Sequence, residues 1–160
     1  MSDKKPYIAP KKKDYVGIYK PNRNNNGACA QLKISSDREC MFLEFAPQVR
    51  PGTDAVPFDW SKDKKICVKI GVTDIGKILS LFNCVLPLNE DKNKPDLELF
   101  HKTGSGNKTI KFKVQQNGYY IKVTMQDGGK LSSLAMPCSW DEAELLKIAL
   151  TRGYEIILGW

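Results

Sequence analysis

The sequence predicts an α+β domain in which antiparallel strands are the main element and helices appear twice. Segments with alternating apolar residues come in two groups, and a segment with helical periodicity follows each group. No linker separates the groups, and 160 residues suffice for one domain with a substantial core. A hydrophobic content of 41% and a charged content of 27% are those of a globular protein. Strands grouped apart from helices are typical of the α+β class.

Three strands are predicted in the first group, because apolar and polar residues alternate along each of them. Their ranges are 27–35, 40–49 and 64–71. Proline cannot donate a ladder hydrogen bond, so Pro47 ends the second strand or places it at a sheet edge. The segment 50–60 is rich in proline, glycine and aspartate, which predicts a loop.

A first helix is predicted over 72–82, where the apolar residues follow helical spacing. Thr73 is the expected N-cap, with Asp74 in the first turn, where the helix dipole favours an acid. A polar loop follows at 86–96. The second group of strands is then predicted at 97–101, in a hairpin within 107–124, and at 130–137.

The last helix is predicted to begin at a capping box, with Ser139 at the N-cap and Glu142 three residues later. Gly153 is placed to end this helix, because glycine is favoured just beyond a helix C-terminus. The apolar tail 154–160 must then pack elsewhere, for example as a second short helix.

The hairpin carries the strongest functional signal. Asn117-Gly118 is typical of a two-residue turn, which would place Lys113 opposite Lys122. One face of the hairpin is predicted to join the core: Ile110, Phe112, Val114, Ile121 and Val123. The other face is wet and basic: Thr109, Lys111, Lys113, Gln115, Tyr120, Lys122 and Thr124. Opposed lysines without an acid on either strand destabilise the pair, and a bound anion would relieve this. The alternative is an ordinary solvated strand face.

The net charge of +7 is concentrated near the N-terminus. Residues 1–26 hold seven basic and two acidic residues, and the other 134 residues hold 18 basic and 16 acidic ones. We expect residues 1–14 to form a flexible basic arm, followed by a single domain over 15–160, because the arm has too little apolar surface to fold alone. Such arms bind polyanions or serve only for solubility.

Several other classes of protein and site are disfavoured. No apolar run approaches the length of a membrane span, and the lysine-rich start does not resemble a secretory signal. The five cysteines are odd in number and far apart, which disfavours a zinc site and indicates free thiols. We therefore expect no metal or cofactor and an intracellular, reducing compartment: the cytoplasm first, with the nucleus or an organelle as alternatives.

An enzyme is not expected. The segment 103–109 resembles a phosphate-binding loop, but Asn107 precedes its lysine and a strand follows instead of a helix. His101 and a cysteine would make a catalytic dyad only if the fold brought them together. Trp60, Trp140 and Trp160 could stack on bases, although packing in a core or an interface is the more usual role of tryptophan.

Segments spread along the chain resemble the Whirly family of single-stranded-DNA-binding proteins. The segments 41–48 and 58–82 resemble its strand ending in Phe-x-Pro, its aromatic-Asp-Trp loop, and its strand followed by a Thr-acid-Ile-Gly helix. "LELFH" (97–101), "GYYIKV" (118–123) and the ending 135–160 resemble later strands and the final helix. The matches keep their order from Tyr15 to Trp160. It is the ordered set that is specific, because no single segment is.

The resemblance implies two four-stranded antiparallel sheets packed against each other, braced by C-terminal helices and one mid-chain helix. It also implies a homotetramer formed through the helices, and sequence-tolerant binding of single-stranded DNA along the sheets. Related folds bind guide RNA or act as transcription coactivators, so RNA is the alternative ligand. The expected nucleic-acid-binding residues are Lys20, Lys33, Phe42, Lys65, Lys69, Lys111, Lys113, Tyr120 and Lys122. Lysines would contact phosphates and rings would stack on bases.

One departure from the family concerns its Lys-Gly-Lys-Ala-Ala motif, which serves DNA contact and higher assembly. Here the segment 19–32 interrupts the motif, with Lys20 and Gly27-Ala28 at stretched spacing and no counterpart of the second lysine. Assembly beyond a tetramer is therefore not implied.

Overall fold

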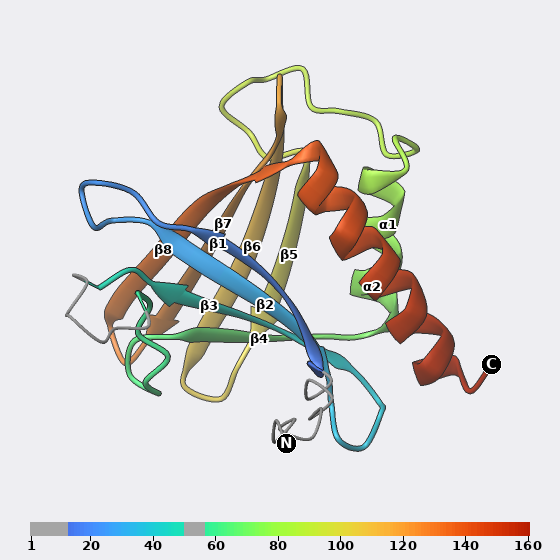
Figure 1. Cartoon of the computed structure of the whole chain (residues 1–160), viewed down its shortest axis with the longest axis horizontal. Helices are drawn as coiled ribbons and strands as arrows, with labels where there is room; N and C mark the ends of the chain where they lie inside the picture. The colour runs from blue at the N-terminus through green and yellow to red at the C-terminus, as the bar shows by residue number, and fades with distance from the viewer. Residues whose placement is uncertain (1–12, 50–56) are drawn as a thin grey trace, which may run out of the picture.

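Two four-stranded sheets and two helices make up the protein in the computed structural model, which describes residues 13–49 and 57–160 (Figure 1). The first sheet contains β1 (Tyr15–Lys20), β2 (Ala28–Ile34), β3 (Met41–Pro47) and β4 (Ile66–Ile70). The second sheet contains β5 (Leu97–Lys102), β6 (Gly106–Gln115), β7 (Gly118–Asp127) and β8 (Lys130–Ser139). Helix α1 (Val72–Phe82) joins the sheets, and α2 (Trp140–Leu158) follows the second.

Both sheets are antiparallel meanders, because every strand pairs with its neighbour in the sequence. The sheets cross, and α1 and α2 lie side by side at one end of the molecule (Figure 1). This confirms the predicted α+β class and its two four-stranded sheets. The predicted arm, residues 1–14, falls almost entirely outside the described residues. Within the described part of the chain, neither helix is long and apolar enough to span a membrane.

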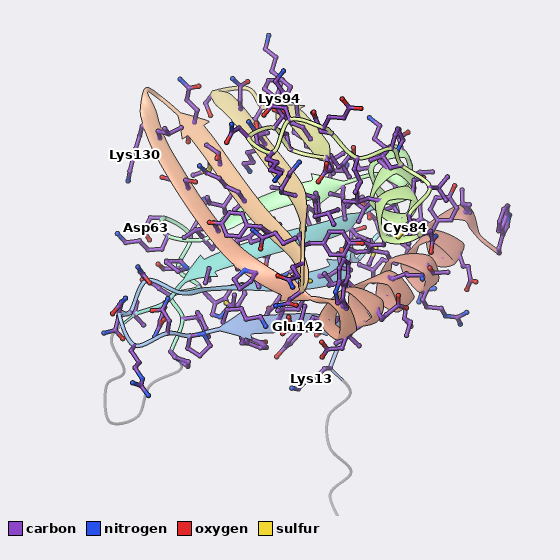
Figure 2. The ribbon with its side chains drawn as sticks, turned by 90° about the horizontal axis from the view of Figure 1, so that it is seen from above. Lys13, Asp63, Cys84, Lys94, Lys130 and Glu142 are labelled. Atoms are coloured by element: carbon purple, nitrogen blue, oxygen red, sulfur yellow. The ribbon has the colours of Figure 1, made fainter. Side chains whose placement is uncertain are left out.

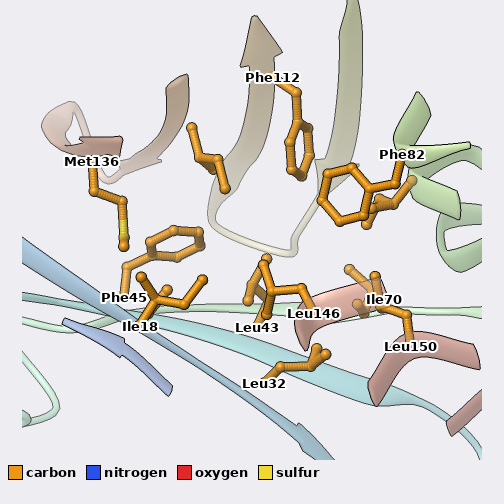
Figure 3. Close-up of a pocket in the computed structure, with 13 residues that line it drawn as sticks. Ile18, Leu32, Leu43, Phe45, Ile70, Phe82, Phe112, Met136, Leu146 and Leu150 are labelled. Atoms are coloured by element: carbon orange, nitrogen blue, oxygen red, sulfur yellow. The ribbon is translucent and has the colours of Figure 1, made fainter. Parts of the chain in front are cut away.

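The core lies between the inner faces of the two sheets and the helices. Alternation along each strand sends every second side chain inward, and these residues are almost fully buried in one continuous cluster. The predicted inner face of the hairpin is confirmed, since Ile110, Phe112, Ile121 and Val123 are at most 2% exposed and Val114 packs against them. A cavity of about 20 Å³ remains among 13 apolar side chains (Figure 3), which offer a water molecule no hydrogen-bond partner.

Helix α1 begins one residue after Gly71, which is its N-cap, so the expectation of Thr73 at this position is wrong. The Asp74 carboxylate instead occupies the third helical position and accepts a hydrogen bond from the Gly71 backbone N–H at 3.2 Å. The capping box of α2 is confirmed, because Glu142 accepts hydrogen bonds from the Ser139 N–H and hydroxyl, both at 2.8 Å.

Helix α2 does not end at Gly153, as the sequence predicts, but continues to Leu158, and Gly159 is its C-cap with a φ of 75°. The tail therefore extends the helix and forms no second one. Gly153 is buried, and a Cβ there would lie 2.3 Å from the sulfur of Met41 on β3. This glycine thus lets the helix approach the first sheet closely, and the αL conformation that ends the helix occurs six residues later.

The hairpin register differs from the predicted one by two residues. Lys113 lies opposite Tyr120, and it is Lys111 that lies opposite Lys122. The turn residues are Gln116 and Asn117, while Gly118 already belongs to β7, with a φ of 141°. A Cβ on Gly118 would lie 2.0 Å from the Cys138 carbonyl oxygen on β8, so close strand contact requires glycine here. A shift of two residues keeps each side chain on its predicted face.

Replacing Gly118 with alanine is expected to destabilise the protein by about 1–3 kcal/mol, because the backbone would be strained and the Cβ would meet a carbonyl oxygen. Urea unfolding followed by circular dichroism measures this. Gly104→Ala is the matched control, since a Cβ at Gly104 meets no atom within 4 Å. Equal stability of the two variants would contradict this account of the register.

Candidate nucleic-acid interface

The outer face of the second sheet brings together most of the lysines expected on the hairpin. Alternation along β6 and β7 places Lys111, Lys113, Tyr120 and Lys122 on this face, in adjacent rows of the ladder. Tyr120 is 39% exposed, and Phe100 on β5 is 59% exposed on the same face. Rings are therefore available on both sides of the Lys111–Lys122 pair.

A depression of about 400 Å³ lies over this part of the sheet. Its lining contains five lysines, one tyrosine and no carboxylate. The lysines are Lys92, Lys94, Lys111, Lys113 and Lys122. Two of them come from the loop between α1 and β5, where Figure 2 labels Lys94 beside strands of the second sheet. The depression is thus wide, open and strongly basic, which suits a polyanion.

Acidic groups from outside the hairpin pair with two of its lysines. Lys113 Nζ lies 3.1 Å from Asp96 Oδ1, and Lys111 Nζ lies 3.7 Å from Glu98 Oε2. The second pair is weak, because both of its side chains are more than 40% exposed to screening solvent. Lys122 is exposed and makes no ion pair with any residue that the structure describes.

The outer face of the first sheet carries a smaller set of the expected residues. Phe42 on β3 lies between Lys33 on β2 and Lys69 on β4, directly opposite both. The ring is half-buried and Lys69 is exposed. Because the two sheets share one core, their outer faces point away from it on opposite sides, and one chain presents two separate lysine surfaces.

Glu44 holds two lysines of the first sheet. Its carboxylate lies 2.8 Å from Lys33 Nζ and 3.0 Å from Lys65 Nζ, and its side chain is only 7% exposed. Burial raises the pKa of Glu44, but the hydrogen bonds and charges of the two lysines outweigh this and hold the pKa below its usual value. These lysines therefore already have a permanent anionic partner.

Lys20 lies apart from both lysine surfaces. Its Nζ is 2.6 Å from Glu142, the residue that caps α2, so the pair ties the end of β1 to the start of that helix. Burial raises the pKa of Glu142, and the hydrogen bonds from Lys20 and Ser139 more than reverse this. The structure therefore gives Lys20 a position that joins two elements, and it is not among the residues that line the depression on the second sheet.

A second basic depression, of about 610 Å³, lies where β4 meets the second sheet. Its lining includes Lys62, Lys65, Lys108 and Trp60, but also the acids Glu44 and Asp127. Lys108 Nζ donates a hydrogen bond to the Cys67 carbonyl at 2.7 Å and so links the two sheets. With three lysines against two acids, this depression is much less positive than the one over β6 and β7.

Sequence reasoning missed several exposed groups on the two sheets and on the loop between α1 and β5. Lys92 and Lys94 lie in a loop that also contains three acids, so the loop has no net positive charge in the sequence. Only the fold shows that these two lysines, and none of the three acids, line the depression. Phe100 had a usable signal, since alternation in "LELFH" places it on the face opposite the buried Leu99. Tyr19, 41% exposed on β1, similarly follows from the alternation around the buried Ile18.

The same fold occurs in solved structures of Whirly proteins. WHY3 from Arabidopsis thaliana superposes with a TM-score of 0.66 at 20% identity, covering 95% of this chain and 92% of that one. The plant transcriptional regulator PBF-2 gives a TM-score of 0.67 at 23% identity, covering 95% and 86%. A guide-RNA-binding protein complex bound to a guide RNA gives 0.66 at 11% identity, covering 94% and 95%. No protein-family model matches the sequence, and no curated protein matches it significantly.

Titration of Glu44 is expected to contribute to the pH dependence of stability. An unfolded glutamate has a pKa of about 4.3, and the folded pKa is lower. The stabilisation is thus complete above the unfolded value and is lost as the pH falls through the folded one. Glu44→Gln should lower the free energy of unfolding by about 1–2 kcal/mol at pH 7 and much less at pH 3.

Urea unfolding at the two pH values measures this difference. Glu39→Gln, at an exposed position in the turn before β3, should leave stability unchanged at both. A Glu44→Gln variant whose deficit is as large at pH 3 as at pH 7 would show that lost packing, and not the charge, accounts for the effect.

Proposed function

We propose that the protein binds single-stranded DNA with little sequence preference and has no enzymatic activity. Lysines on the outer faces of the sheets would contact phosphates, and exposed rings would stack on bases. The basic depression on the second sheet carries this proposal, because five lysines converge there around Tyr120 without a carboxylate in the lining. Single strands are generally bound by such a combination of a cationic track and stacking platforms.

The similarity of fold to Whirly proteins and to a guide-RNA-binding complex supports a nucleic-acid ligand. The ion pairs that some of the expected lysines make within the protein would compete with a phosphate to different degrees. Lys122 and Lys69 make no ion pair with a described residue, and the Lys111–Glu98 pair is exposed and long. These lysines would contact phosphate first, whereas Lys33 and Lys65 would have to leave Glu44. We therefore propose the second sheet as the main contact surface.

The double substitution Lys111→Gln, Lys122→Gln is expected to weaken binding to oligo-dT and to mixed sequences equally. Phosphate contacts release counterions, so the logarithm of affinity falls with the logarithm of salt concentration by about 0.7 for each contact to a single strand. Loss of two contacts should therefore reduce the slope by about 1.4. Fluorescence anisotropy over a salt series gives both quantities.

The matched control is Lys64→Gln, Lys130→Gln, which removes the same charge from two exposed positions outside the depression and outside the helices. It should change the slope little. If both double variants bind alike, overall charge accounts for binding and the assignment of the site fails.

RNA is the second candidate ligand, because the guide-RNA-binding complex has the same fold. Matched DNA and RNA oligonucleotides competing for the wild-type protein would decide between them. A clear preference for RNA would replace the first proposal, and absence of binding to either would reject both.

We also propose a homotetramer that assembles through the helices. Helix α2 exposes Leu145 at 46% and Ile148 at 66%, one turn apart, and the chain ends in Trp160, which is 86% exposed. Adjacent exposed apolar residues of this kind mark interaction surfaces. Trp140, at the start of the same helix, is also 46% exposed.

Ile148→Lys is expected to shift the assembly towards the 18.0 kDa single chain, because a charge would be buried in the interface. Light scattering coupled to size exclusion measures the mass. Leu131→Lys is the control, since Leu131 is similarly exposed, at 69%, but lies on β8. Wild-type protein that is already monomeric, or an unchanged mass for Ile148→Lys, would contradict this assembly.

A further inference from the structure

The carboxylate of Asp96 joins the loop 83–96 to the second sheet. Its side chain is fully buried. Oδ2 accepts a hydrogen bond from the Val114 backbone N–H at 2.7 Å, and Oδ1 accepts one from the Asn89 N–H at 2.7 Å. One carboxylate thus binds a residue of β6 and a residue at the far side of the loop.

Lys113 completes the same arrangement. Its Nζ donates to Asp96 Oδ1 at 3.1 Å and lies 3.4 Å from the carbonyl oxygens of Asn89 and Asp91. The three N–H groups of the ammonium are therefore directed into the loop, and the side chain is only 24% exposed. A lysine held in this way has no donor left for a phosphate.

The loop that these bonds hold carries two of the five lysines of the depression. Between Asn89 and Asp96, the chain makes a tight turn in which Asp91 accepts hydrogen bonds from Asn93 and Lys94 through its side chain and its carbonyl. Lys92 and Lys94 are exposed and line the depression together with the lysines of β6 and β7. Their position over the sheet depends on where the loop is fixed.

We propose that Asp96 and Lys113 form a latch that fixes this loop on the sheet and so places Lys92 and Lys94 where they contact the phosphates of a bound strand. Lys113 is then a positioning residue, and its charge serves the loop instead of the ligand. This inference rests on the proposed binding of nucleic acid. According to this proposal, Asp96 strengthens the binding of nucleic acid, although its negative charge alone would be expected to weaken the binding of a polyanion.

The sign of one substitution tests the latch. Asp96→Asn and Glu98→Gln each remove one negative charge near the same surface, but only Asp96 holds the loop. If charge alone matters, both variants bind oligo-dT more tightly than the wild type. If the latch operates, Glu98→Gln binds as well or better, whereas Asp96→Asn loses about fivefold or more in affinity, as expected for loss of two phosphate contacts.

A double-mutant cycle identifies the lysines involved. Lys92→Gln, Lys94→Gln should weaken binding in the wild-type background and have little further effect in Asp96→Asn, because the loop is already misplaced. Additive losses, or tighter binding by Asp96→Asn, would overturn the proposal.

Limited trypsin digestion without ligand gives a readout that does not depend on nucleic acid. Cleavage after Lys92 should be faster in Asp96→Asn than in Glu98→Gln, while urea unfolding shows whether both variants are folded. Equal cleavage rates in folded variants would show that Asp96 does not fix the loop. If the wild type binds no nucleic acid, the proposed function fails, and with it the role of the lysines, even where digestion still reveals the latch.

Discussion

Burial of the inner faces of both sheets in one core is the constraint from which the rest of the structure follows. Phe45 of the first sheet and Phe112 of the second are both at most 1% exposed within the same cluster. Since side chains alternate along a strand, fixing these residues inward fixes their neighbours outward. Lys111 and Lys113 thus lie on the outer face of the second sheet because Ile110 and Phe112 lie on the inner one. The core pattern therefore determines which positions lie on the outer face, but it does not determine that these positions are lysines.

This dependence accounts for what could be predicted from the sequence. The apolar period gave seven of the eight strands that the structure describes, both helices and the faces of the hairpin, because burial enforces it. It did not predict β1, in which only Ile18 is buried and the alternation is weak. The hairpin register depends instead on one close contact, between Gly118 and the Cys138 carbonyl, and the length of α2 depends on how Gly153 meets Met41. Local preferences predict that Gly118 lies in the turn and that Gly153 ends the helix. Both predictions are wrong because contacts between distant segments determine these two features, and such contacts leave no periodic signal in the sequence.

The charges of the site were the least predictable part, because their partners come from other elements. The hairpin itself contains no acid near its lysines, yet Asp96 and Glu98 reach it from the neighbouring edge of the sheet. Glu44 similarly forms ion pairs with Lys33 and Lys65, so a bound anion would have to compete with its carboxylate. A buried carboxylate and its lysine partners depend on one another, because removing either partner leaves a buried charge uncompensated. Hence the lysines divide into those that hold the structure and those, such as Lys122, that remain open to a ligand.

The same division bears on how selective such a surface can be. An ammonium group that contacts a phosphate carries no information about the base, and a phenol ring can stack on any base. Among the groups that line the depression on the second sheet, only the side-chain amides of Asn93 and Gln115 can offer a paired donor and acceptor to a base edge. Asn93 belongs to the loop that Asp96 fixes, and Gln115 ends β6 beside the turn. Under the proposed function, recognition of a base edge by paired hydrogen bonds from side-chain amides would therefore arise at these two positions, at the margin of the depression.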